Sequence, residues 1–452
     1  MVIDLVLGVS IHPLMRMETK QLETNVQSNR RNFLGGVAAG GFLGLAQPAA
    51  AGKVADPTRK VLMVFQHGGL SQLESWDPKP NTRHGGPFRS IATTIPGTHI
   101  SELLPHTAKQ VHHLAILRGL NTGDANHDSA RVTMLTGWRQ GVRGGQYPSY
   151  GSVFNHLEGS KHTQPSFVVL AQRDQWHLKP LVDASYLGAR FAPIVSFDEM
   201  PPLNVAPPPE LTSARQKRRE QLREQLNEDF STSRGQPSGK SKVAAGRSGR
   251  GQAAFENSFV KARHLIRQRK MFDISKVSER DKQRYGQHAF GRRCLIARQL
   301  LEQNVSIVKL NHGNYDTHFE NFNHHLHRLE EFDRPFAALI EDLASRGLLN
   351  DTLVIVTGEF GRTPGINSSI GRDHWANAWS IALAGHGIKP GVVYGKTNAT
   401  GTAVSAGQVG FGDVFHTIYS ALKLDPEREL HNGEQPLKMF EQVGKPIKQV
   451  LA

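Results

Sequence analysis

The chain alternates short runs of apolar residues with longer stretches of helical periodicity, and this alternation limits its fold more than any other feature. The clearest run is Leu353-Val354-Ile355-Val356, in which apolar residues follow one another without a polar break. An unbroken run is typical of a strand covered on both faces in a parallel sheet. Comparable runs stand at residues 60–66, 113–118, 166–171, 305–310 and 380–384. Such strands, alternating with helices, predict an α/β fold: a three-layer sandwich with a mostly parallel central sheet.

The length of 452 residues is compatible with one elaborated α/β domain or with several smaller ones. We predict a single domain over residues 52–452, interrupted by a flexible basic insert at about 207–252. Within the insert, Ser213–Phe230 has the composition of a charged helix with few core positions. Ser231–Gln252 is rich in Ser, Gly and Arg and lacks apolar periodicity, which is typical of a flexible surface segment.

Beyond the insert, residues 255–303 and 319–346 have the periodicity of amphipathic helices. Pro335 lies inside the second stretch, where it is expected to kink or split the helix. The single cysteine, Cys294, excludes an intramolecular disulfide and a Cys-rich zinc site. It falls within a helical pattern, so we interpret it as a packed core thiol.

The N-terminal segment has the features of an export signal. Arg30-Arg31 precede a Gly/Ala-rich apolar run at residues 35–46, and Ala49-Ala50-Ala51 follow. This order predicts a twin-arginine signal peptide over residues 1–51, and hence a periplasmic or otherwise exported protein whose partner is the twin-arginine export machinery. The apolar run is shorter than the roughly 20 residues that span a bilayer, so no stable membrane anchor is expected. The alternative is a chance Arg pair ahead of a buried helix.

The formal net charge of +14 would suggest a polyanionic partner if it formed one patch. Much of it lies in the leader and in the basic insert, so we expect no nucleic acid partner. The 22 His residues are more informative, because neutral imidazole is the commonest metal ligand in proteins and several of them stand near acidic residues.

Candidate metal ligands follow the predicted strands at their carboxyl ends, where ligands of open α/β sheets gather. They are His67, Asp316, His318, Glu359, Asp373 and His374. Imidazole and carboxylate groups that converge at one edge suit one or two divalent ions, with zinc, manganese and calcium as candidates. The alternative is a salt-bridge network in which Glu359 pairs with Arg362 or Arg372.

A second group of candidates begins a predicted helix that runs to Leu135, with Asp128 or Ser129 as its N-cap. His127 lies at this N-terminus, where backbone N–H groups favour an anion, and could act as nucleophile or general acid/base. Arg131 follows one helical turn later and could hold a phosphate- or sulfate-like group. Ser129 is the rival nucleophile, and a loop His127 with a solvated Arg131 is the alternative without function.

Long motifs spread over nearly the whole mature chain resemble those of the domain-of-unknown-function 1501 family, a family of exported bacterial proteins within the alkaline phosphatase/sulfatase superfamily. They include VLMVFQHGGLSQLESWDPKP, HDSARVTMLTG, DTLVIVTGEFGRTP and GRDHW. The resemblance implies an alkaline phosphatase-like fold. It also implies that Asp316, His318 and His374 are ligands of one metal.

The same resemblance places His127 at the nucleophile position, which holds neither Cys nor Ser, so formylglycine chemistry is not expected. An Asp-Ser-Ala sequence stands two residues out of register and keeps Ser129 open as the nucleophile. His67 falls where the superfamily has an Asp. Glu359-Phe360 stand where it has Asp-His or Asp-Asn, and Phe360 cannot bind a metal. A one-metal or altered site is therefore expected.

Together these features predict a metal-dependent hydrolase of phosphate or sulfate esters, acting on a small-molecule or glycan ester. His127 would attack or transfer a proton, and Arg131 with Arg362 would bind the substrate and neutralise developing charge. The alternative is a non-catalytic member of the superfamily that binds sulfated or other polyanionic glycans.

Overall fold

The computed structural model describes residues 59–142, 146–158, 166–172, 184–197, 211–233 and 269–452. Asp56–Ala452 forms one compact unit. The predicted signal peptide over residues 1–51 lies outside the described residues, as do residues 207–210 and 234–252 of the predicted insert. The charged helix expected in that insert is α4, Ser213–Ser233.

The centre of the unit is an eight-stranded sheet with the order β12-β4-β11-β8-β1-β7-β5-β6. Every neighbouring pair is parallel except those that involve β11, which is antiparallel to both β4 and β8. The prediction of a mostly parallel central sheet is therefore confirmed. In the order of the sheet, the strands are Val392–Tyr394, Leu114–Leu120, Trp379–Gly385, Thr352–Thr357, Lys60–Gln66, Ile307–His312, Phe167–Ala171 and Ile194–Phe197.

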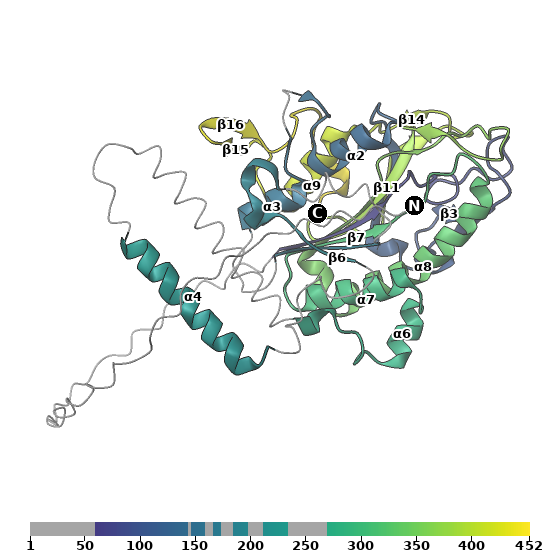
Figure 1. Cartoon of the computed structure of the whole chain (residues 1–452). Helices are drawn as coiled ribbons and strands as arrows, with labels where there is room; N and C mark the ends of the chain where they lie inside the picture. Colours follow the sequence, from purple (N-terminus) through teal and green to yellow (C-terminus); the bar gives the residue numbers. More distant parts are fainter. Residues whose placement is uncertain (1–58, 143–145, 159–165, 173–183, 198–210, 234–268) are drawn as a thin grey trace, which may run out of the picture. The chain divides into compact units, whose positions relative to one another are not determined.

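Helices cover both faces of this sheet, because each central strand is apolar on both sides. In β1, Leu62 and Val64 pack into one core and Val61, Met63 and Phe65 into the other. The first core is covered by α1 (Pro105–Ala108), α6 (Glu279–Tyr285), α7 (Ala289–Glu302) and α8 (Asn321–Ser345). The second is covered by α2 (His127–Thr136), α3 (Tyr150–Glu158) and α9 (Phe411–Ala421). These layers make the predicted three-layer sandwich (Figure 1).

Short strands and single-turn helices connect these elements. Within the residues that the structure describes, four two-stranded ladders pair β2 with β3, β9 with β10, β13 with β14 and β15 with β16. Their bounds are Ser90–Ala92, His99–Ser101, Gly361–Arg362, His374–Trp375, Lys396–Thr397, Val404–Ala406, Glu429–Asn432 and Gln435–Lys438. The 3-10 helices span Val111–His113, Ser185–Leu187, Ala189–Phe191, Arg269–Phe272, Leu348–Asn350 and Lys448–Val450.

The expectation for Pro335 in α8 is wrong in part, and the expectation for Cys294 in α7 is confirmed. Helix α8 is a single element that passes through Pro335, so the proline does not split it. A proline inside a helix costs about 3 kcal/mol, and the buried rings of Phe332 and Phe336 on either side offset that cost by packing into the core. Cys294 lies fully buried in α7, as expected, and its burial raises the pKa of the thiol. None of the helices in the described part of the chain combines the length and the apolar character needed to cross a bilayer.

Candidate functional site

Three neighbouring strands deliver the first site residues. β8, β1 and β7 are adjacent in the sheet and parallel, so the loops that follow them start at the same edge. Glu359, His67 and Asp316 stand in these loops. The β1 and β7 loops approach so closely that a Cβ at Gly68 would lie 2.7 Å from the backbone nitrogen of Asp316. Gly68 also has a φ of +103°, so glycine is required there on both counts.

A short hairpin returns the chain to this edge. β9 and β10 pair so that Arg362 stands opposite His374. The loop between them is held from inside by Arg372, whose Nη2 donates to Glu74 Oε1 at 2.9 Å and to the His84 carbonyl at 2.8 Å. Both charged side chains are fully buried. The hairpin with its buried ion pair therefore fixes where His374 lies.

Helix α2 supplies the next segment of the site. Its N-cap is Asn126, whose side-chain oxygen accepts hydrogen bonds from the backbone N–H groups of Asp128 and Ser129. The expectation that Asp128 or Ser129 would be the cap is therefore wrong. Asn126 has an extended backbone, as a cap residue needs. His127 is the first helical residue, and its ring lies in the site, whereas Ser129 contributes a backbone N–H to the cap.

Three of the predicted ligands lie in mutual contact. His318 Nε2 is 2.9 Å from His374 Nε2, and each of these nitrogens is 3.2 Å from Asp316 Oδ1. His127 joins the group from the other side, with its Nε2 3.3 Å from Asp316 Oδ2. Within the described residues, His127, Asp316 and His374 also form a set whose ligand atoms all lie within 4.8 Å of one another.

The second nitrogen of each imidazole shows how the rings are protonated. His374 Nδ1 is 2.8 Å from the Ala125 carbonyl oxygen, which can only accept, so this nitrogen carries a proton. His318 Nδ1 lies 2.7 Å from Asp373 Oδ1, and the carboxylate likewise only accepts. In neutral rings, both Nε2 atoms therefore present lone pairs, and these lone pairs face each other across 2.9 Å.

This arrangement fits a divalent metal ion. Two lone pairs at that distance repel unless a proton or a cation lies between them, and a carboxylate oxygen completes the group. In a tetrahedral zinc site with bonds of about 2.0–2.1 Å, neighbouring ligand atoms stand about 3.3 Å apart, close to the observed 2.9 and 3.2 Å. Metal-bound His residues also donate their other N–H to a carboxylate or carbonyl, as both do here. His318, His374 and Asp316 are thus the residues that would hold the ion, with Asp373 behind His318.

His127 lies between two carboxylates. Its Nδ1 is 2.8 Å from Glu359 Oε1, which also accepts from the Gly68 backbone N–H at 2.9 Å. Burial disfavours the charged ring, but the neighbouring carboxylates of Asp316 and Glu359 raise the pKa of His127 to about 9. Burial likewise disfavours ionised Glu359, yet the hydrogen bond from His127 holds the pKa of this carboxyl below its usual value. The pair is a buried carboxylate that orients an imidazolium.

Arg362 is fully buried, and all of its guanidinium nitrogens are engaged. They donate to the carbonyl oxygens of Gly68, Gly69 and Arg372 and, at 2.6 Å, to Asp316 Oδ1. Burial disfavours ionised Asp316, but the two imidazoles and Arg362 keep the pKa of Asp316 well below its usual range. This placement makes Arg362 a residue that positions Asp316, with four of its five N–H groups donated within the protein.

His67 and Arg131 form a neighbouring contact. Arg131 Nη1 lies 2.8 Å from His67 Nε2, and Nη2 donates to Asp128 at 2.6 Å. Since a guanidinium has no acceptor, His67 Nε2 must accept, and its lone pair is taken. His67 Nε2 also lies 4.0 Å from Glu359 Oε1. The structure thus places these residues beside the Glu359–His127 pair and apart from the three mutually touching ligands.

Phe360 occupies the space between the two groups. Its ring centroid is 4.8 Å from that of His127 and 4.7 Å from that of His374, and the side chain is fully buried. It packs with Ala130 and Ala376 in a small apolar cluster. The Phe360 side chain thus fills the position at which the family resemblance implies a metal ligand. The remaining donor atoms form one candidate metal site.

Sequence reasoning named the members of this site but missed the residues that support it. Glu74, Asn126 and the Ala125 carbonyl were not anticipated, although each fixes a predicted residue. Asn126 had a usable signal, because Asn is among the strongest N-cap residues. The Glu74–Arg372 pair has no local signal, since its members are 298 positions apart. The proposed pairing of Glu359 with Arg362 or Arg372 is not the one observed, because Glu359 contacts His127 instead.

The fold and the site thus define an α/β protein with imidazole and carboxylate groups gathered at the carboxyl edge of its sheet. The chain belongs to the family described as "Protein of unknown function (DUF1501)", which matches residues 58–451. No curated protein matches the chain in sequence.

Several solved structures are similar over most of the chain. The lipoteichoic acid synthase LtaP from Listeria monocytogenes is 8% identical, with 85% of this chain and 75% of that chain covered and a TM-score of 0.35. The PsFucS1 sulfatase from Pseudoalteromonas sp. is 14% identical, with 83% and 69% covered and a TM-score of 0.38. The alkaline phosphatase from the Antarctic bacterium TAB5 is 11% identical, with 81% and 99% covered and a TM-score of 0.37. At such scores the likeness is loose and says nothing about the reaction of this chain.

Proposed function

We propose that the protein is an exported, metal-dependent hydrolase of phosphate or sulfate esters. The observation behind the proposal is the contact of His318, His374 and Asp316 through the three atoms best suited to bind a cation. Two imidazole nitrogens favour zinc or manganese over calcium, which prefers oxygen ligands. When bound, such an ion would polarise an ester oxygen and lower the pKa of a bound water.

His127 is the residue we assign to proton transfer. Glu359 holds its Nδ1, which leaves Nε2 as the atom directed toward Asp316, one of the three candidate metal ligands. With Nδ1 held by a buried carboxylate, Nε2 is the ring nitrogen placed to exchange a proton with a group bound at these residues.

The two arginines act through other residues in this proposal. Arg362 fixes Asp316, and Arg131 fixes His67, through hydrogen bonds of 2.6 and 2.8 Å. Both guanidinium groups are almost completely buried, with side-chain exposures of 0% and 4%. They supply positive charge close to the site, which favours an anionic substrate group.

The experiment is elemental analysis of the mature protein combined with a panel of aryl phosphate and aryl sulfate esters. We expect a stoichiometric transition metal, turnover that a chelator abolishes, and loss of metal in His374→Ala. His127→Gln should retain the metal and lose most of the turnover, by about 10²–10⁴-fold for a general acid. Protein without bound metal that still hydrolyses esters, or full activity in His127→Gln, contradicts the proposal.

A second candidate is non-catalytic binding of sulfated or other polyanionic glycans. It is favoured by Phe360, whose buried ring takes the place of a ligand. Dextran sulfate binding that survives chelation and disappears in Arg131→Ala would support this candidate. Chelator-sensitive ester turnover would exclude it as the sole function.

A further inference from the structure

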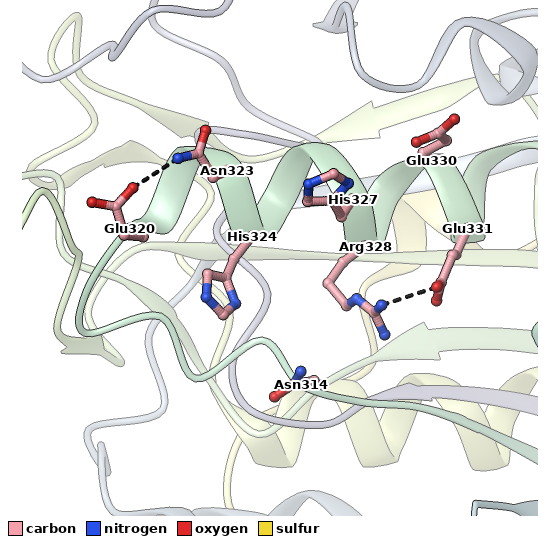
Figure 2. Close-up of a pocket in the computed structure, with 8 residues that line it drawn as sticks. All are labelled: Asn314, Glu320, Asn323, His324, His327, Arg328, Glu330 and Glu331. Atoms are coloured by element: carbon pink, nitrogen blue, oxygen red, sulfur yellow. Dashed lines mark hydrogen bonds and ion pairs between the residues drawn. The ribbon is translucent and has the colours of Figure 1, made fainter.

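A pocket of about 540 Å³ opens beside the first three turns of α8. Figure 2 shows His324, Arg328 and Glu331 on the side of the helix that faces the loop carrying Asn314. Asn323, a neighbour on the helix, donates to Glu320 Oε2 at 2.7 Å. The volume falls within the range of roughly 300–1,000 Å³ that is usual for small-ligand sites.

One loop joins this pocket to two of the candidate metal ligands, Asp316 and His318. β7 ends at His312 and α8 begins at Asn321, and the residues between them serve both places. Asn314 lines the pocket two positions before Asp316, and Glu320 lines it two positions after His318. Two residues of extended chain span at most about 7 Å. The pocket and the three candidate metal ligands therefore draw on neighbouring residues of one loop.

The charge of the pocket argues against an anionic occupant. Its lining contains three carboxylates, Glu320, Glu330 and Glu331, and one guanidinium, Arg328. Arg328 Nη2 is 2.9 Å from Glu331 Oε1, so its charge is already balanced. Like charges in a shared pocket repel, so a sulfate or phosphate group is unfavourable here.

The remaining groups suit hydroxyls. Within the described part of the chain, the Asn314 amide and the His327 imidazole have no hydrogen-bonding partner, although both line the pocket. An amide, an imidazole and a carboxylate together offer donors and acceptors, as vicinal hydroxyl groups require. Phe319 adds an apolar surface, since it is 57% exposed and its ring meets the edge of His324 at 5.7 Å between centroids. Polar groups beside an exposed aromatic ring match the two kinds of surface that a sugar presents.

We propose that this pocket binds an uncharged sugar residue of a glycan ester, while the esterified residue lies at the metal ligands. The placing of the ester rests on the hydrolase function proposed above, whereas sugar binding itself does not. The substrate class is thereby narrowed to glycans in which an esterified unit is joined to an unesterified one.

The test is binding of the mature protein to an array of short uncharged oligosaccharides, printed beside their sulfated counterparts. The variant is Asn314→Gly combined with His327→Ala. Glycine keeps the left-handed backbone of Asn314, where φ is +74°, and His327 is exposed, so neither change disturbs the core. The matched control is His431→Ala, which removes an exposed imidazole from β15.

We expect binding to at least one uncharged oligosaccharide, weakened about tenfold or more in the double variant, as loss of one or two hydrogen bonds implies. His431→Ala should bind like the wild type. Binding to sulfated glycans alone, or equal binding by the double variant, overturns the inference. Turnover of small aryl esters should be unchanged in the double variant. Sugar binding without any ester turnover would therefore reject the proposed hydrolase and keep the sugar site, and turnover without sugar binding would do the reverse.

Discussion

His318 and His374 face each other through Nε2 atoms 2.9 Å apart, although the Nδ1 of each ring is already bound to an acceptor. Neither ring can donate to the other without taking on a second proton. Asp316 lies 3.2 Å from both nitrogens and supplies the negative charge that a cation at this point would need. The contact is therefore best understood as two sides of a metal coordination shell.

The first prediction concerns Asp373, which orients His318 without belonging to the three mutually touching ligands. Asp373→Asn should lower zinc affinity by about 10–100-fold, as is usual when the carboxylate behind a ligating His is removed. Competition with a zinc-chelating dye measures the affinity directly. Asp351→Asn is the control, because Asp351 precedes β8 and lies at the opposite end of that strand. Equal zinc affinity in Asp373→Asn and wild type would contradict the orienting role.

The second prediction concerns the ion pair of Glu74 and Arg372, both of which are fully buried. Glu74→Gln leaves the guanidinium buried without its counter-charge, and breaking such a pair costs about 3–5 kcal/mol. Urea unfolding should show this loss. Because Arg372 holds the loop that ends at His374, the variant should also bind zinc more weakly.

An exposed pair provides the comparison. Arg139 and Glu441 form an ion pair in which the arginine side chain is 61% exposed. Glu441→Gln should change the free energy of unfolding by about 1 kcal/mol or less, since solvent screens such pairs. Similar losses in Glu441→Gln and Glu74→Gln would show that burial does not set the energy of the Glu74–Arg372 pair.

The sequence predicts the fold well because buried parallel strands are recognisable from their local pattern of apolar residues. The runs that form β1, β5 and β8 each contain at least four apolar residues in succession, the run that forms β7 is interrupted by Lys309, and each matches an observed strand within a few residues. The rule that ligands gather at strand carboxyl ends then places the loops after β1, β7 and β8 together. Neither step needs knowledge of contacts between distant segments.

The geometry of the site could not be predicted in the same way. Arg362 was expected to bind substrate, but its pairing across from His374 in the β9–β10 hairpin buries it against three backbone carbonyls. Only the folded loop decides this. Glu74 has no local pattern either, because a buried charge is recognisable only by its partner. Three cap-type residues, Asn126, Asp128 and Ser129, stand within four positions, and the extended backbone of Asn126 shows which of them caps the helix.

The third prediction tests the proposed export. Replacing Arg30 and Arg31 with Lys should leave the precursor in the cytoplasm, because the paired arginines are the recognised feature of a twin-arginine signal. Fractionation of the host followed by immunoblotting measures the outcome. Arg16→Lys is the control, since it changes an arginine of the same leader outside the pair. Equal amounts of periplasmic protein from both variants would contradict the assignment of residues 1–51.

The fourth prediction concerns Lys309, a buried cation in β7. Its ammonium lies 5.0 Å from the centroid of the Phe65 ring, and the residue is 5% exposed. Burial, helped by Arg131 and opposed by Glu359, lowers the pKa of Lys309 from 10.5 to about 7. Between these two values the unfolded chain binds a proton that the folded protein does not. The free energy of unfolding must therefore rise with pH across this window.

Lys309→Met removes the titrating group and keeps a side chain of similar length. The stability of the wild type relative to this variant should rise by up to about 1.4 kcal/mol for each pH unit within the window. Below pH 7 the difference should be constant, because Lys309 is then protonated in both states. Urea unfolding of both proteins across this range measures the effect. Parallel pH profiles for wild type and variant would show that Lys309 keeps its ordinary pKa in the folded protein.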